Sequence, residues 1–246
     1  MNDIFNENVP LKTETPAFAK HVLPAVPLSE VYLEDCVTAL KRFNDNHFDL
    51  AIVDPPYDFG ITGTHYASQK KYGHKQENRP NSGIKIGGNY LDALSDIPNS
   101  EYFKQLFRVS KNQIIWGGNY FTQHLSPSMC WIGWYKMNGD KSYFSDFELA
   151  WTSYQKRTYI FKEPISKTHK GRIHPTQKPI TLYEFCYYVA KLEQGDLILD
   201  THLGSGSSRI AAYKGGFDFV GFEIDSDYFN AQEKRFNEFK SQLRLF

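Results

Sequence analysis

Hydrophobic and polar positions along the chain alternate between short continuous apolar runs and runs with helical spacing. The run FDLAIVD at 48–54 is apolar almost throughout, which is typical of a parallel strand covered on both faces. Similar runs predict further strands at 29–35, 112–121, 129–136, 147–154, 196–200 and 217–225. Helical spacing predicts helices at 36–46, 100–110, 180–193 and 207–216, followed at the end by a polar helix. Strands that alternate with helices predict an α/β fold with a mostly parallel sheet.

Two stretches lack any clear period. Residues 1–29 contain several prolines and are predicted to form an extended N-terminal arm. From 58 to 89 the chain is rich in Gly, Lys, His and Asn, which predicts a long loop inserted into one domain over 30–246. Long loops inside compact domains are commonly functional.

The bulk composition narrows the class of protein. A chain of 246 residues can bury the core of one domain, and its 28 basic and 28 acidic residues give no net charge. The three cysteines form no C-x-x-C pair and the histidines show no metal-ligand spacing, so neither a disulfide framework nor a metal is expected. There is no basic-then-apolar leader and no apolar run of membrane length, which predicts a cytoplasmic protein without membrane contact.

The glycine-rich stretch DTHLGSGSS starts at Asp200, between a predicted strand and a predicted helix. Gly204 and Gly206 let the backbone approach a ligand, and the helix N-terminus offers free N–H groups. Glu223, near the end of the next strand, has the spacing of an acid that binds ribose hydroxyls. Arg209 stands where a dinucleotide fingerprint has its third glycine, and no phosphate-binding Gly-Lys-Ser/Thr is present. Because Asp200 could meet an amine, the turn favours S-adenosylmethionine over NAD or ATP; a plain strand-to-helix connection is the alternative.

A second stretch, DPPY from Asp54 to Tyr57, follows the apolar strand. Its two prolines donate no backbone hydrogen bond and fix the backbone angle φ. On its own the tetrapeptide fits either a turn that ends a strand or a rigid surface that holds a flat ligand.

Together with HPTQKP at 174–179, these stretches resemble the beta group of amino-methylating DNA methyltransferases, the adenine-N6 and cytosine-N4 enzymes. DPPY comes first and the glycine turn last. That order implies a circularly permuted, Rossmann-like S-adenosylmethionine-dependent methyltransferase fold, with helices on both faces of the sheet. The resemblance covers roughly residues 30 to 235. It implies a catalytic group made of Asp54, Pro55, Pro56 and Tyr57. The residues implied for cofactor binding are Asp35, Thr176, Lys178, Asp200, His202, Gly204, Ser205, Gly206, Ser207 and Glu223.

One departure from the family pattern lies in the glycine turn. The family usually has Asp-Pro-Phe before the glycines, and this chain has Asp200, Thr201 and His202. The acid and the glycines remain, but the apolar contact that the phenylalanine would make with the cofactor is in doubt.

The chemistry expected of DPPY follows from the weak nucleophilicity of an exocyclic amine, whose lone pair is delocalised into the ring. The Asp54 carboxylate and the Pro55 carbonyl would each accept one N–H of the amine and expose its lone pair to the sulfonium methyl group. Asp54 is expected to be ionised, with an ordinary pKa of about 3.9. Tyr57 would stack on a base flipped out of the duplex, which is worth about 1–3 kcal/mol.

Two basic stretches are candidates for phosphate contacts with double-stranded DNA, the expected partner. One is the inserted loop, and the other is a short target-recognition segment at about 152–173, within a stretch 152–178 that has seven Lys or Arg against one Glu. The candidate residues are Lys70, Lys71, Lys75, Arg79, Lys156, Arg157, Lys170 and Arg172. The resemblance also suggests a homodimer and a paired restriction endonuclease.

Adenine-N6 is the expected target, because the tetrapeptide begins with an acid and a serine there would favour cytosine-N4. Cytosine-N4 methylation is therefore the main alternative. A nicotinamide oxidoreductase is disfavoured by Arg209. A DNA-binding relative without catalysis is disfavoured by the complete DPPY and glycine turn, although His202 keeps it open.

Overall fold

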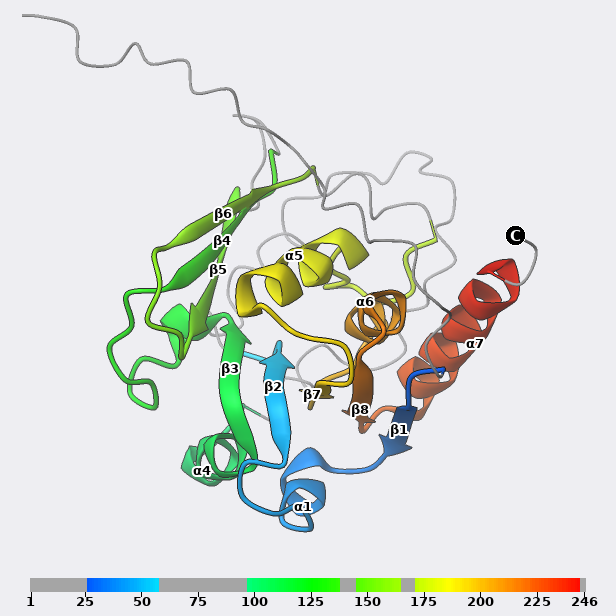
Figure 1. Cartoon of the computed structure of the whole chain (residues 1–246), viewed down its shortest axis with the longest axis horizontal. Helices are drawn as coiled ribbons and strands as arrows, with labels where there is room; N and C mark the ends of the chain where they lie inside the picture. Colours follow the sequence, from blue (N-terminus) through cyan, green and yellow to red (C-terminus); the bar gives the residue numbers. More distant parts are fainter. Residues whose placement is uncertain (1–25, 58–96, 138–144, 165–170, 244–246) are drawn as a thin grey trace, which may run out of the picture.

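An eight-stranded sheet organises the described part of the chain (Figure 1). The computed structural model describes residues 26–57, 97–137, 145–164 and 171–243, so most of the predicted arm 1–29 and all of the loop 58–89 lie outside the described residues. The order across the sheet is β1-β8-β7-β2-β3-β5-β4-β6. The strands are β1 (Ser29–Leu33), β2 (Phe48–Val53), β3 (Ser110–Trp116), β4 (Trp131–Tyr135), β5 (Phe147–Thr152), β6 (Tyr159–Lys162), β7 (Leu197–Asp200) and β8 (Asp218–Glu223).

Most neighbouring strands run parallel. The series from β1 through β8, β7 and β2 to β3 is parallel throughout, and β6 is parallel to β4. Among these eight described strands, only β5 runs antiparallel to its two neighbours, β3 and β4. The predicted α/β class with a mostly parallel sheet is confirmed.

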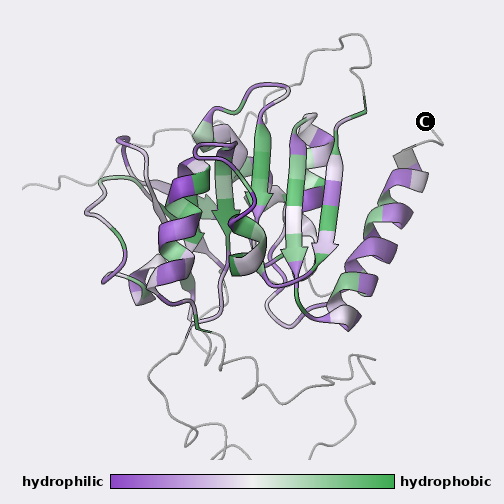
Figure 2. Cartoon of the chain, turned by 90° about the horizontal axis from the view of Figure 1, so that it is seen from below, coloured by the Kyte–Doolittle hydropathy of each residue, from purple (hydrophilic) through white to green (hydrophobic). Residues whose placement is uncertain are grey.

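Helices cover both faces of this sheet (Figure 1). One face carries α1 (Cys36–Leu40) and α4 (Ser100–Val109). The other face carries α5 (Ile180–Ala190) and α6 (Ser207–Gly215), with α7 (Ser226–Leu243) packed beside α6. Figure 2 shows apolar strands between helices whose outer sides are hydrophilic.

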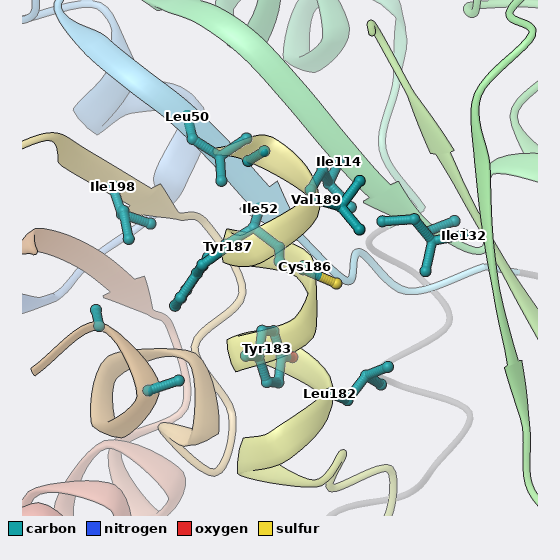
Figure 3. Packing of buried hydrophobic residues seen from close by; sticks show 14 of the residues in the cluster. Leu50, Ile52, Ile114, Ile132, Leu182, Tyr183, Cys186, Tyr187, Val189 and Ile198 are labelled. Carbon is teal, nitrogen blue, oxygen red and sulfur yellow. The ribbon is translucent and has the colours of Figure 1, made fainter. Parts of the chain in front are cut away.

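The position of β2 at the centre of the sheet, with helices on both sides, explains why its sequence is apolar on both faces. Leu50 and Ile52 pack with α5 in one core cluster (Figure 3), while Ala51 and Val53 pack with α1 and α4 in the other. All four side chains are at most 1% exposed. The continuous apolar run therefore fills two cores, as expected of a parallel strand with helices on both sides.

The structure differs from the predicted elements in three places. The strand predicted at 112–121 ends at Trp116, and Gly118–Tyr120 form a 3-10 helix instead. The helix predicted at 36–46 ends at Leu40, because Arg108 donates to the carbonyls of Leu40 and Phe43 and the chain turns at Asn46, whose φ is 54°. The basic stretch 152–178 contains the edge strand β6, which the sequence analysis did not predict.

The order of the strands reverses at the centre of the sheet, between β7 and β2. From β7 the chain passes through α6 to β8 in one direction, whereas from β2 it passes through α4 to β3 in the other. In open α/β sheets, ligands bind at the carboxyl ends of the strands where the order reverses. Asp200 ends β7 and Asp54 follows β2, so the two predicted loops meet at this position.

Candidate active site

Asp54 and Lys178 form a buried ion pair directly after β2. Lys178 Nζ donates to Asp54 Oδ2 at 2.5 Å, and the Lys178 side chain is 3% exposed. The expected ordinary pKa for Asp54 is wrong, because burial raises this pKa and the nearby Lys178 only partly opposes the rise. Lys178, a predicted cofactor contact, therefore lies against the predicted catalytic acid, and its contact with a cofactor stays a prediction.

A second carboxylate shares the same lysine. Lys178 Nζ lies 3.2 Å from Oε2 of Glu148 on β5, and Lys136 Nζ lies 2.5 Å from the other oxygen, Oε1. Burial alone would lower the pKa of Lys178, but Asp54 and Glu148 raise it overall. Burial would raise the pKa of Glu148, but the two lysines hold it below its usual value. Two carboxylates and two ammonium groups thus form one cluster without net charge at the edge of the sheet where β2 ends.

Tyr57 is held against the loop that follows β3. Its ring stacks on Tyr120 with centroids 4.5 Å apart and planes 9° apart. Gly117 approaches the same ring so closely that an added Cβ would lie 2.6 Å from two of its carbon atoms. Gly117 also has a φ of 68°, which a glycine adopts without strain. The Tyr57 ring at the end of DPPY is therefore packed against Tyr120 and Gly117, and Pro55 within the tetrapeptide is buried.

The glycine turn lies between β7 and α6. Gly204 and Gly206 have φ values of 51° and 68°, in the left-handed region that favours glycine. A Cβ on Gly206 would meet the side chain of Gln232 at 3.1 Å. Arg235 of α7 donates to the Ser205 carbonyl at 2.6 Å and to Ser207 Oγ at 2.9 Å, so α7 holds the turn in place.

Asp200 is a buried acid at the start of this turn. Its carboxylate accepts hydrogen bonds from Ser208 Oγ at 2.5 Å and from the His202 backbone N–H at 3.0 Å. Burial raises the pKa of Asp200 to about 7 in spite of these bonds. A cationic ligand group placed beside it would favour the ionised form.

The two other predicted acids already bind backbone groups. Glu223 accepts N–H bonds from Gly204 at 2.8 Å and from Ile224 and Asp225 at 3.0 Å each, which ties the glycine turn to β8. A carboxylate has about four acceptor positions, so Glu223 keeps one for a ligand. Asp35 caps the N-terminus of α1 by accepting from the backbone of Thr38.

His202, the departure from the family pattern, is a neutral aromatic side chain here. Burial lowers its pKa to about 4, its ring meets Tyr102 edge-on at 5.5 Å, and Thr201 Oγ1 lies 2.9 Å from its Nδ1. A neutral imidazole can present an uncharged ring face to a ligand, as phenylalanine would.

HPTQKP crosses over the glycine turn. The His174 ring lies 3.5 Å from the Cβ position of Gly204 and 4.3 Å, between centroids, from the ring of Tyr228. Thr176 is exposed and bonds to His174 Nδ1. The structure therefore brings HPTQKP, DPPY and the glycine turn together at one edge of the sheet.

The structure describes only some of the residues predicted to contact DNA. Lys70, Lys71, Lys75, Arg79 and Lys170 lie outside the described residues. Arg172 donates to the His174 carbonyl, beside the glycine turn. Lys156 and Arg157 follow the antiparallel strand β5, which places them at the sheet edge opposite Asp54. Lys156 also donates to the Val189 carbonyl near the end of α5. Binding of DNA by these residues stays a prediction.

Sequence reasoning missed Glu148, Lys136, Arg235 and Tyr120. A usable signal existed for Glu148 alone, an acid inside the otherwise apolar strand run FELAWT. The described part of the chain contains no cluster of side chains suited to a metal ion. It also contains no helix long and apolar enough to cross a membrane.

A glycine turn and an Asp-Pro-Pro-Tyr bracket at the switch point of a parallel sheet define the class as an α/β methyltransferase that acts on an amino nitrogen. Residues 48–234 match the family model for DNA methylase, so the chain belongs to this family of adenine-N6 and cytosine-N4 enzymes. The predicted resemblance and the circularly permuted fold are confirmed.

Known proteins similar to this chain agree with that family. The Type II methyltransferase M2.MboI of Moraxella bovis is 23% identical over 87% of this chain and 92% of its own length. M.HpaI of Haemophilus parainfluenzae is 24% identical over 84% of this chain and 75% of its own.

Two solved structures share the fold. The first is TTHA0409 of Thermus thermophilus, assigned as a DNA modification methylase, with a TM-score of 0.52 and 17% identity over 86% of this chain and 95% of its own. The second is the cytosine-N4-specific PvuII DNA methyltransferase, with a TM-score of 0.52 and 12% identity over 88% of this chain and 93% of its own.

Proposed function

We propose that this DNA methyltransferase transfers a methyl group from S-adenosylmethionine to the N6 amine of an adenine flipped out of double-stranded DNA. The observation that carries the proposal is the position of Asp54, an ionisable acceptor, at the switch point beside the glycine turn. TTHA0409 has also been crystallised with S-adenosyl-L-methionine.

The residues of the glycine turn fit this cofactor. Gly204 and Gly206 leave two positions of the turn without a side chain, so the backbone can approach the cofactor there. Glu223 keeps one acceptor position for a ribose hydroxyl, and Asp200 offers a buried carboxylate to the amine of the methionine part. When bound, the cofactor supplies a methyl group on a sulfonium sulfur. The pKa of about 7 for Asp200 fits a group whose ionised form is completed by a bound cation.

The residues of the bracket act on the base. Asp54 and the Pro55 carbonyl accept the two N–H bonds of the amine and direct its lone pair out of the ring plane. The prolines keep that carbonyl fixed and offer no competing N–H. Tyr57 stacks on the flipped base and fixes the distance of the amine from Asp54. The nitrogen gains the methyl group, loses one proton, and the proton passes to Asp54 and then to water.

Adenine is favoured over cytosine because Asp54 is an acid. Cytosine-N4 methylation remains the second candidate, since the cytosine-N4-specific PvuII enzyme shares the fold. Both bases present an exocyclic amine with two N–H bonds, so the geometry of the bracket suits either one.

The test is to incubate the protein with unmethylated DNA and labelled S-adenosylmethionine, digest the DNA and separate the nucleosides by mass spectrometry. N6-methyladenine is expected. N4-methylcytosine would replace the adenine proposal by the second candidate, and an absence of cofactor binding at micromolar concentrations would refute both.

The Asp54→Ala variant should lose transfer while it keeps cofactor affinity, because the acid contacts the base and not the cofactor. Transfer at the wild-type rate in Asp54→Ala would contradict the role given to Asp54.

The DNA contacts and assembly remain part of the proposal. Arg172 lies near the site and is the best placed of the described basic candidates. A homodimer and a paired restriction endonuclease are proposed from the family alone. Light scattering of the purified protein would test the dimer.

A further inference from the structure

Lys178 is shared by two carboxylates. Its Nζ lies 2.5 Å from Asp54 Oδ2 and 3.2 Å from Glu148 Oε2. The Lys178 side chain is only 3% exposed, so water cannot replace either partner freely. A small shift of Nζ would make Glu148 the nearer of the two.

In this arrangement Asp54 is already occupied. The proposed function needs this carboxylate to accept an N–H from the base, but an ammonium group lies at ion-pair distance from it. An ammonium group left buried without a partner costs several kcal/mol. Lys178 therefore needs a second carboxylate before Asp54 can be released to the base.

Glu148 is placed for that purpose. Because β5 runs antiparallel to β3, the beginning of β5 reaches the edge where the parallel strands end. Lys136, just after β4, holds Glu148 Oε1 at 2.5 Å and leaves Oε2 directed at Lys178. The cluster stays neutral whichever carboxylate Lys178 prefers.

We propose that Glu148 is a positioning residue for methyl transfer, which takes Lys178 from Asp54 when a base amine enters the site. The inference rests on the proposed function. In the transfer, the new N–C bond forms as the S–C bond breaks, and the electron pair of the broken bond stays on sulfur. The nitrogen then carries the positive charge, and Asp54, released from Lys178, accepts the proton that the nitrogen loses.

The first experiment compares two isosteric variants under single-turnover conditions with saturating DNA and cofactor. In Glu148→Gln, Lys178 has Asp54 as its only carboxylate, so the rate constant should fall about 10- to 100-fold, the range of one charge-assisted hydrogen bond. The dissociation constant for the cofactor should change by less than about twofold.

The matched control is Asp49→Asn. Asp49 pairs with Lys111 at 2.6 Å at the opposite edge of the sheet, and its side chain is 27% exposed against 23% for Glu148. This control should keep the wild-type rate. A Glu148→Gln variant that is as fast as the wild type, or no slower than the control, would overturn the proposal.

A third variant removes the other cation of the cluster. In Lys136→Met, Glu148 loses the group that holds its Oε1 but keeps Lys178 beside its Oε2, so transfer should fall less than in Glu148→Gln. A purely structural cluster would slow transfer in both variants, and equal slowing would overturn the proposal. If Lys136→Met does not fold, the comparison of Glu148→Gln with Asp49→Asn still tests whether Glu148 acts as a positioning residue.

A titration without turnover separates this inference from the proposed function. Carbon-13 NMR of labelled aspartate, with Asp54 assigned through Asp54→Asn, follows its pKa in the ligand-free protein. Glu148 raises the pKa of Asp54, so Glu148→Gln should lower it. A wild-type protein that transfers no methyl group would contradict the proposed function alone. An unchanged Asp54 titration would contradict the coupling whatever the activity.

Discussion

Replacing Gly117 by alanine should displace the aromatic ring that is proposed to stack on the base. The added Cβ would lie 2.6 Å from Tyr57 Cδ1 and Cε1, where ordinary contacts are 3.4–4 Å, so the ring must move by about 1 Å. A misplacement of about 1 Å can cost roughly 100-fold in rate, and the loss of one base-stacking contact of about 1–3 kcal/mol corresponds to about 5- to 150-fold. We therefore expect the single-turnover rate constant of Gly117→Ala to fall about 10- to 100-fold.

The matched control is Gly195→Ala. Gly195 has a φ of 92° and nothing within 4 Å of its Cβ position, so it has the backbone strain without the steric conflict. Gly195→Ala should lose about 1–2 kcal/mol of stability in urea unfolding, because it places a side chain at a positive φ, and Gly117→Ala should lose at least as much because the steric conflict with Tyr57 adds to the strain. Only Gly117→Ala should lose transfer. Equal transfer in the two variants would refute the reasoning that Tyr57 must keep its position.

Further outcomes are expected at three residues, Asp200, Arg235 and Ile52. Because burial raises the pKa of Asp200 to about 7, cofactor affinity measured by calorimetry should fall up to about tenfold per pH unit below that value, and Asp200→Asn should remove the dependence. In the ligand-free protein the same raised pKa favours folding below about pH 4, and this contribution is lost as the pH rises through 7. Arg235→Met should weaken cofactor binding about tenfold while the rate at saturation is kept, because the arginine fixes the glycine turn from α7; an unchanged affinity would contradict that role. Ile52→Ala should cost about 2–5 kcal/mol in urea unfolding, since the side chain is fully buried against α5, and a loss below about 1 kcal/mol would contradict the packing.

Local patterns in the sequence predicted the strands that are apolar on both faces and the loops that follow them. The apolar run at 48–54 predicted β2 correctly, because helices pack against both faces of this strand and apolar side chains are needed at both contacts. Edge strand β6 was missed because only one of its faces is partly buried, and its basic neighbours suggested DNA contacts instead.

Contacts between distant residues could not be predicted in the same way. Lys178 and Asp54 lie 124 positions apart, and Glu148 comes from a third element, so only the folded sheet brings the three together. The same burial raises the pKa of Asp54, which a model-peptide value cannot anticipate. Sequence therefore identified the kinds of groups at the site, and the structure supplied their pairing.

The permuted order of the strands also affects how the protein is made. Strand β2 leaves the ribosome early, but its parallel neighbour β7 follows about 140 residues later, and β1 waits for β8. At about 5–20 residues per second of synthesis, the unpaired side of β2 stays open for roughly 7 to 30 s. Exposed strand edges of this kind favour aggregation during synthesis. The arrangement that places the glycine turn beside the Asp-Pro-Pro-Tyr bracket thus leaves an unpaired strand edge on the nascent chain until α6 and β8 have emerged.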